Sequence, residues 1–222
     1  MFFVYMLAIA LPCSIGRAEG QTPSVLFFGD SLTAGKDVAK DEAYPAAIER
    51  LARTDGVEFT AINGGLSGDT SAGGVRRIEW FLKRPFDVFF IALGANDGLR
   101  GLPPSDTEKN LSAIIEKVRA EHPDIPVIVA GMRLPATYGM RFDTEFQQVF
   151  ERVAKKYHAD YFPFLLQGVG GEPKLNNPDG IHPNPGGHEV IAGQLWPILK
   201  PIVIAVDKRE GAAANTGPAV IK

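Results

Sequence analysis

The chain has 222 residues, of which 45% are hydrophobic and 22% charged, and its formal net charge at pH 7 is −3. This length and apolar content suffice for one globular domain with a substantial core, whereas the slightly acidic balance offers no basic surface for a nucleic acid partner. The single cysteine, Cys13, excludes an intramolecular disulfide framework and a cysteine-based metal site.

The first 20 residues have the pattern of a secretory signal peptide. An apolar run over 1–11 is followed by small residues and then by the first charges, Arg17 and Glu19. The run is shorter than the roughly 20 residues that a membrane-spanning helix needs. We therefore expect 1–20 to direct export to the periplasm or the medium, without stable membrane insertion.

Between residues 21 and 206, segments with the pattern of strands alternate with segments with the pattern of helices. Apolar runs predict five strands, at 25–28, 58–62, 88–93, 127–130 and 160–164. Helical periodicity predicts helices at 44–53, 71–83, 106–121, 141–157 and 186–200. Such alternation is typical of a single α/β domain, a three-layer α/β/α sandwich around a mostly parallel five-stranded sheet. The tail 207–222 has little to pack and is expected to be disordered.

A serine follows the first predicted strand, within Gly29-Asp30-Ser31-Leu32. Ser31 would then lie on a tight turn at the carboxyl edge of the sheet, where open α/β sheets bind ligands. By itself such a tripeptide is a common turn or helix cap. Near the C-terminus, however, Asp179-Gly180-Ile181-His182 offers a base and a group to orient it, which a nucleophilic serine requires. These residues predict a catalytic triad of Ser31, His182 and Asp179.

Acyl transfer also needs donors for the developing oxyanion. The main-chain N–H groups of Ser31 and Gly68 and the side-chain amide of Asn96 all follow predicted strands. Taken alone, Gly68 could be a simple turn residue and Asn96 a loop cap. Their joint occurrence at successive strand ends favours an oxyanion hole.

With these motifs the chain resembles the SGNH superfamily of GDSL hydrolases, whose Ser, Gly, Asn and His match Ser31, Gly68, Asn96 and His182. The likeness covers about 24–203 and is greatest to the bacterial branch of thioesterase I, lysophospholipase L1 and arylesterase. Supporting stretches are 63–71, 92–97, 133–139 and 179–184, whereas the glycine-rich stretch 167–174 departs from the pattern. The resemblance implies a flavodoxin-like fold, an acyl-enzyme on Ser31, hydrolysis of aryl esters, acyl thioesters or lysophospholipids, and neither metal nor cofactor.

Apolar residues after the fourth and fifth strands are expected to contact the acyl part of a small ester or lipid substrate. They are Leu134, Pro135, Tyr138, Phe162 and Leu165. The alternative for Phe162 and Leu165 is a place in the core. A carbohydrate O-deacetylase of the same superfamily is the enzymatic alternative. The sequence does not determine the oligomeric state and is compatible with a monomer.

Two other classes of site are disfavoured. A flavodoxin-like module that binds a phosphate or a cofactor would explain the glycine-rich loops, but no G-x-x-x-x-G-K-[ST] or G-x-G-x-x-G motif follows a strand. A metal site could gather several acids and histidines, but each has a simpler role: the acids bind loop backbone or cap helices, and His188 is expected to be a surface or capping residue. The side chains in question are Asp30, Asp69, Asp97, Asp179, His182 and His188.

Overall fold

The computed structural model describes residues 22–134 and 139–214. Five parallel strands form one sheet in the order β2-β1-β3-β4-β5. The strands are β1 (Ser24–Gly29), β2 (Thr60–Gly65), β3 (Val88–Ala92), β4 (Val127–Ala130) and β5 (Asp160–Phe162). Strands β3 and β4 are buried along their whole length, as expected where helices cover both faces.

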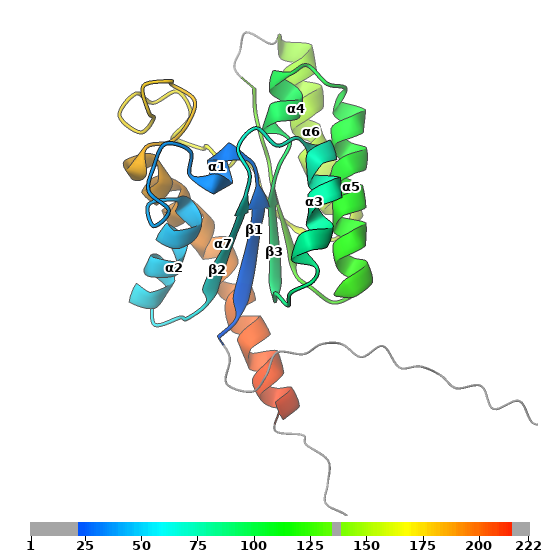
Figure 1. Cartoon of the computed structure of the whole chain (residues 1–222), viewed down its shortest axis with the longest axis vertical. Coiled ribbons are helices and arrows are strands. Elements are labelled where there is room, and N and C mark those ends of the chain that lie inside the picture. The colour runs from blue at the N-terminus through cyan, green and yellow to red at the C-terminus, as the bar shows by residue number, and fades with distance from the viewer. Residues whose placement is uncertain (1–21, 135–138, 215–222) are drawn as a thin grey trace, which may run out of the picture.

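Helices cover the two faces of this sheet in two separate groups (Figure 1). On one face lie α2 (Tyr44–Thr54) and α7 (Pro185–Ala214), which pack against each other. On the other face lie α3 (Ser71–Phe81), α5 (Pro104–Glu121) and α6 (Met140–Lys156). The short helices α1 (Ser31–Ala34) and α4 (Ala95–Leu99) follow the ends of β1 and β3. The predicted three-layer α/β/α sandwich is confirmed.

Aromatic residues of β1 pin the centre of the sheet. Successive side chains on a strand point to opposite faces, so Phe27 meets Tyr44 of α2 edge-on at 5.8 Å between ring centroids, and Phe28 meets Phe81 of α3 at 5.6 Å. A third ring, Phe90 of the neighbouring strand β3, lies 5.4 Å from Phe27. The rings that pack on β1 therefore come from a helix on each face of the sheet and from β3. The turn after β1 is consequently held on a rigid base.

The last helix is longer than predicted. We expected a helix over 186–200 and disorder from 207, but α7 continues to Ala214, so the prediction was wrong for 207–214. Val203 and Val206 are buried and extend the packing face past Pro201, and the following lysine, arginine, glutamate and alanines are good helix formers. By length and composition Pro185–Arg209 could cross a membrane, but core helices share these properties and α7 packs against α2. The predicted leader 1–20 and residues 215–222 lie outside the described residues.

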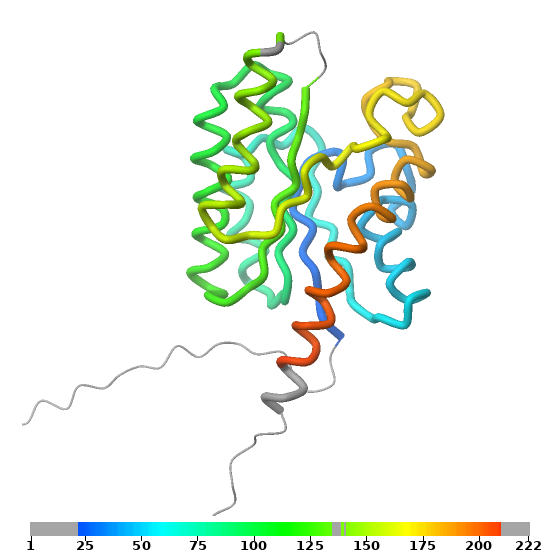
Figure 2. Tube along the Cα trace, turned by 180° about the vertical axis from the view of Figure 1, so that it is seen from behind, coloured from blue at the N-terminus to red at the C-terminus, as the bar shows by residue number. Residues whose placement is uncertain are grey.

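Parallel strands bring all their carboxyl ends to one edge of the sheet. The turns after β1, β2 and β3, at 30–43, 66–70 and 93–103, lie at this edge. We call these three segments, which include the short helices α1 and α4, the catalytic-edge loops, and this edge the catalytic edge. The start of β1 and the C-terminal part of α7 both lie at the opposite edge (Figures 1 and 2). Function is therefore to be sought at the catalytic edge.

Candidate active site

Ser31 is the first residue of α1, immediately beyond the end of β1. Gly29 closes the strand in a space that admits no side chain, because a Cβ there would lie 2.6 Å from the carbonyl oxygen of Ala92. Asp30 is the N-cap of α1, and its Oδ1 accepts a hydrogen bond of 3.0 Å from the main-chain N–H of Leu32. The glycine and the cap thus direct Ser31 to the carboxyl edge of the sheet.

Ser31, His182 and Asp179 form a continuous hydrogen-bonded chain. Ser31 Oγ lies 2.9 Å from His182 Nε2, and His182 Nδ1 lies 2.5 Å from Asp179 Oδ2. The fold brings these groups together from distant parts of the chain: the serine and the histidine are 151 positions apart in sequence. Gly180, with φ of 69°, makes the tight turn that lets the acid face the imidazole.

The Asp179 carboxylate is held in its ionised form. Its Oδ1 accepts hydrogen bonds from the main-chain N–H groups of His182 at 3.0 Å and of Ile181 at 2.9 Å. The His182 N–H contributes most, then the His182 ring and the Ile181 N–H, and together they hold the pKa of Asp179 well below its usual range. An ionised carboxylate accepts the proton of Nδ1, so Nε2 is left as the acceptor for the Ser31 hydroxyl.

The Asp179–His182 turn is closed at its base. The main-chain N–H of Asn177 donates to the carbonyl of His182 at 2.8 Å, and the Asn177 side chain donates to the carbonyl of Pro183 at 3.2 Å. The same amide reaches the carbonyl of Lys36 at 3.4 Å, in the segment that follows α1. These contacts fix the imidazole loop to the serine turn.

Three donors suited to an oxyanion lie at the ends of adjacent strands β1, β2 and β3. The N–H of Ser31 begins a helix and so has no acceptor within it. Gly68 has φ of 78°, and among the described residues no atom lies within 4 Å of where its Cβ would be, so its backbone is open to a ligand. The Asn96 amide donates one N–H to the carbonyl of Asp69 at 2.9 Å, which leaves the second N–H available.

Hydrogen bonds join the catalytic-edge loops to one another. The Leu66 N–H donates to the carbonyl of Gly29 at 3.1 Å, and the Arg100 guanidinium donates to the carbonyl of Gly68 at 3.0 Å. The Arg77 guanidinium links the ends of β1 and β2, because it donates to the carbonyls of Gly29 and Gly64 at 3.0 and 2.6 Å. The three donors are thereby held in one framework.

The acids near the site have structural partners. Asp69 Oδ2 pairs with Arg77 at 2.9 Å, and Asp97 accepts hydrogen bonds from the main chain and hydroxyl of Ser71 at 2.8 and 2.5 Å. Asp30 is fully buried, and desolvation raises its pKa to about 7. Across 22–134 and 139–214, no group of three or more His, Cys, Asp or Glu side chains is placed to hold a metal ion.

Of the five predicted substrate-contacting residues, the structure describes three. Leu134, Phe162 and Leu165 are buried in the core, which agrees with the core alternative for Phe162 and Leu165, and their contact with a substrate stays a prediction. Leu134 packs closely on Gly98 of α4: a Cβ added to Gly98 would lie 2.6 Å from the Leu134 Cδ2. Pro135 and Tyr138 lie outside the described residues. The apolar residues exposed at the catalytic edge, which the analysis of the sequence missed, are Leu66, Leu102 and Ile181.

His188 was expected to be a surface or capping residue; the surface alternative was wrong, because His188 is buried. It lies in the first turn of α7, and this turn packs against the start of α2, where the Tyr44 N–H donates to His188 Nδ1 at 3.2 Å. The two rings stack at 6.2 Å. Burial lowers the pKa of His188 to about 4, so the imidazole is neutral at neutral pH.

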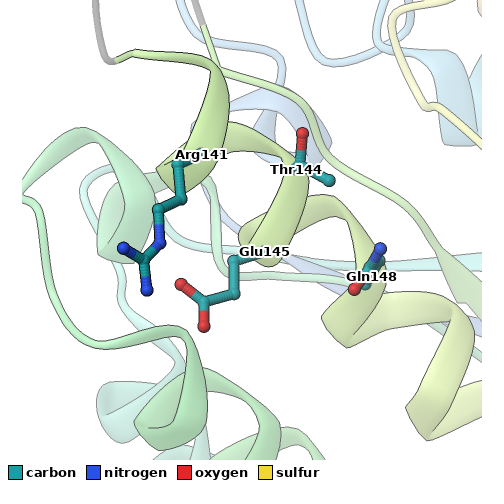
Figure 3. Close-up of a pocket in the computed structure, with 4 residues that line it drawn as sticks. All are labelled: Arg141, Thr144, Glu145 and Gln148. Atoms are coloured by element: carbon teal, nitrogen blue, oxygen red, sulfur yellow. The ribbon is translucent and has the colours of Figure 1, made fainter.

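An open hollow on α6 is a separate feature. It is lined by the exposed polar residues Arg141, Thr144, Glu145 and Gln148 (Figure 3). Arg141 and Glu145 project to the same side of the helix. None of the triad or oxyanion residues lines this hollow, so it is not the candidate active site.

Comparison with known proteins is consistent with the geometry. The sequence pattern of the GDSL-like Lipase/Acylhydrolase family matches residues 27–190. The chain is 35% identical to Esterase TesA of Pseudomonas aeruginosa over 88% of this chain and 96% of that protein. It is 34% identical to Thioesterase 1/protease 1/lysophospholipase L1 of Escherichia coli K12 over 81% and 85%. The crystal structure of AlinE4, described as an SGNH-hydrolase family esterase, has a TM-score of 0.69 at 35% identity and covers 90% of this chain and 99% of its own.

Proposed function

Because the chain belongs to the GDSL-like lipase/acylhydrolase family and is an SGNH-type esterase, we propose that Ser31 is the nucleophile through which it hydrolyses carboxylic esters. One observation carries the assignment: Ser31 Oγ, the His182 imidazole and the Asp179 carboxylate form a continuous chain of hydrogen bonds at 2.9 and 2.5 Å. The flavodoxin-like binding module is not favoured, because it leaves the hydrogen-bonded Ser31, His182 and Asp179 without a role.

The reaction proceeds through an acyl-enzyme. His182 Nε2 takes the hydroxyl proton as Ser31 Oγ attacks the acyl carbonyl carbon, and Asp179 stabilises the imidazolium that forms. The N–H groups of Ser31 and Gly68 and the amide of Asn96 donate to the oxyanion. Collapse breaks the bond to the alcohol or thiol, which leaves with the proton of His182. Water, deprotonated in turn by His182, attacks the acyl carbonyl carbon. The bond to Ser31 Oγ then breaks as His182 returns the proton to that oxygen, which releases the carboxylic acid and the free serine.

The proposed substrates are aryl esters, acyl thioesters and lysophospholipids. The names of the relatives, an esterase and a thioesterase/lysophospholipase, support this class and do not favour a carbohydrate O-deacetylase. No cofactor or metal is required by the chemistry, because the base, the acid and the oxyanion donors are all side chains or backbone of this chain.

The site of action is proposed to be the periplasm or the medium. The apolar segment at 1–11 and the small residues after it support an exported protein. Fractionation of cells that express the full chain tests this: the mature protein should appear outside the cytoplasm with 1–20 removed, and an intact N-terminus in the cytoplasm would refute it.

Hydrolysis of p-nitrophenyl esters from acetate to palmitate, by wild type and by Ser31→Ala, tests the proposed function. We expect activity that depends on Ser31 and extends to medium or long chains. Activity confined to acetate would favour a deacetylase. Equal activity in the two proteins would remove Ser31 as the nucleophile. Labelling of Ser31 by a fluorophosphonate is the complementary measurement.

A further inference from the structure

Large apolar side chains are exposed at few places among the described residues. The four are Leu66 at 50%, Trp80 at 56%, Leu102 at 37% and Ile181 at 51%. Three of them stand on loops at the catalytic edge, after β2, after α4 and in the turn that carries His182, and we call Leu66, Leu102 and Ile181 the apolar rim. Trp80 lies near the far end of α3, which leads away from that edge to the start of β3. Three of the four exposed large apolar side chains therefore lie on loops at the edge of the sheet that carries Ser31.

The rim residues stand on anchored backbone. The N–H of Leu66 donates to the carbonyl of Gly29 at 3.1 Å, and the N–H of Leu102 donates to the carbonyl of Asp97 at 3.0 Å. Ile181 donates to the triad carboxylate itself. Each loop is therefore tied through its backbone to a strand end, to α4 or to the triad.

Two cations contact the same loops. Arg100 is exposed and donates to the carbonyl of Gly68, two residues after Leu66. Lys36 Nζ lies 4.0 Å from the carboxylate of Asp179, two residues before Ile181, and also pairs with Asp37. Lys36 is therefore compensated by two carboxylates, whereas the acceptor that Arg100 contacts is a main-chain carbonyl, which carries no net charge. Apolar side chains beside such a cation match a lipid surface, in which acyl chains lie below phosphate head groups.

We propose that the apolar rim, with Arg100, docks the enzyme on a phospholipid surface, so that a lysophospholipid enters the site directly from the lipid phase. This inference rests on the proposed function and deepens it by naming where the substrate is taken up. The rim meets the acyl region, Arg100 meets the phosphates, and Ser31 then faces the ester bond at the boundary between them.

Co-sedimentation with vesicles of phosphatidylcholine and phosphatidylglycerol tests the docking without turnover. Ser31→Ala is the parent protein, and the double change Leu66→Ser with Leu102→Ser is added to it. We expect the parent to bind and the double change to weaken partitioning by about tenfold or more, since two apolar side chains lose their transfer into lipid. Trp80→Ser in the same parent is the matched control and should leave partitioning unchanged.

Lipid charge gives a second measurement. Arg100→Gln in the parent should weaken binding to the anionic vesicles and have little effect on binding to pure phosphatidylcholine, and added salt should act in the same way. Failure of the parent to bind, or equal losses from the rim change and from Trp80→Ser, would overturn the docking proposal. Association of the parent into dimers through the rim would do so too. The p-nitrophenyl ester assay with wild type is independent of these outcomes, so failure of the docking and failure of the proposed function are distinguishable.

Discussion

His182 donates to the carboxylate of Asp179 from two places at once: its main-chain N–H lies 3.0 Å from Oδ1 and its ring Nδ1 lies 2.5 Å from Oδ2. The first contact sets the backbone of the turn and the second sets the plane of the imidazole. Within four residues, the chain therefore defines both where the base stands and which of its nitrogens faces Ser31.

Replacement of the acid should disable the base. In Asp179→Asn the side-chain amide can donate to Nδ1, which moves the imidazole proton to Nε2 and removes the acceptor for the Ser31 hydroxyl. We expect kcat to fall by about 10³ to 10⁴ on a p-nitrophenyl ester. Circular dichroism should show an intact fold, and near-normal turnover in the folded variant would contradict the role of Asp179.

Removal of the nucleophile should abolish most turnover. Ser31→Ala deletes only one oxygen in a nearly buried position, so little change in thermal stability is expected. Turnover should fall by about 10³ to 10⁶, and the remaining activity would come from the oxyanion donors and from substrate binding. Steady-state kinetics and a thermal melt on the same preparation make the comparison.

Loss of the amide donor should affect kcat more than KM. The oxyanion forms only on the way to the transition state, so Asn96→Ala should lower kcat by about 10² to 10³ and leave KM nearly unchanged. Asn110→Ala is a suitable control, because Asn110 donates to Ser71 Oγ in the same region but has no donor role in the reaction. A similar loss of kcat in both variants would indicate a disturbed loop rather than a lost donor.

Arg77 should be the main support of the catalytic-edge loops. Its guanidinium joins the carbonyls of Gly29 and Gly64 to the buried Asp69 carboxylate and lies 4.0 Å above the Phe28 ring. Arg77→Met leaves that carboxylate unpaired and should lower the free energy of unfolding by about 3 to 5 kcal/mol. Arg77→Lys should recover only part, because an ammonium lacks the planar fork. Urea denaturation measures both.

His188 should make stability depend on pH in the acid range. Desolvation by burial, opposed by Glu42 and Glu189 and assisted by His182, lowers the pKa of His188 to about 4 from an ordinary value of 6.5. Between these values the unfolded state binds more protons, so this contribution is complete above pH 6.5 and is lost as the pH falls to about 4, on the order of 3 kcal/mol.

Comparison with His188→Asn isolates this term, since an amide oxygen can accept the Tyr44 N–H but does not titrate. The difference in unfolding free energy between wild type and variant should shrink as the pH falls from 6.5 to 4. A difference curve is needed because Asp30, with its raised pKa of about 7, acts with the opposite sign: its contribution decreases as the pH rises from about 4 to 7. A pH-independent difference would show that His188 does not titrate in this range.

The layers of the fold could be predicted from the sequence because β1, β3 and β4 are continuous apolar runs and the helices have one apolar stripe. Strand β2 was displaced: the expected 58–62 is Thr60–Gly65 in the structure. Its last residues, Asn63 to Gly65, have turn-like composition, yet they pair in register with Phe27 to Gly29. Gly65 is needed there because a Cβ would lie 2.1 Å from the Ala34 nitrogen, a tertiary constraint that no local pattern reveals.

The candidate site divides in the same way. The pairing of Ser31 with His182 and Asp179 could be expected from motif spacing, and their catalytic role stays a prediction. Burial could not be foreseen. Leu165 and His188 lie inside because β5 and the first turn of α7 pack against neighbouring elements, whereas Leu66 and Leu102 stay outside because short loops hold them there.

The placement of the chain ends has a practical meaning for handling the enzyme. The start of β1 and the C-terminal part of α7 both lie at the edge of the sheet opposite the turn after β1, which carries Ser31 (Figures 1 and 2). A resin, sensor chip or fluorescent protein coupled at the C-terminal part of α7 would therefore stand on the side of the sheet away from the reacting groups. The immobilised enzyme would then present its active site to the solution, where substrate carried on droplets or on coated beads could reach it.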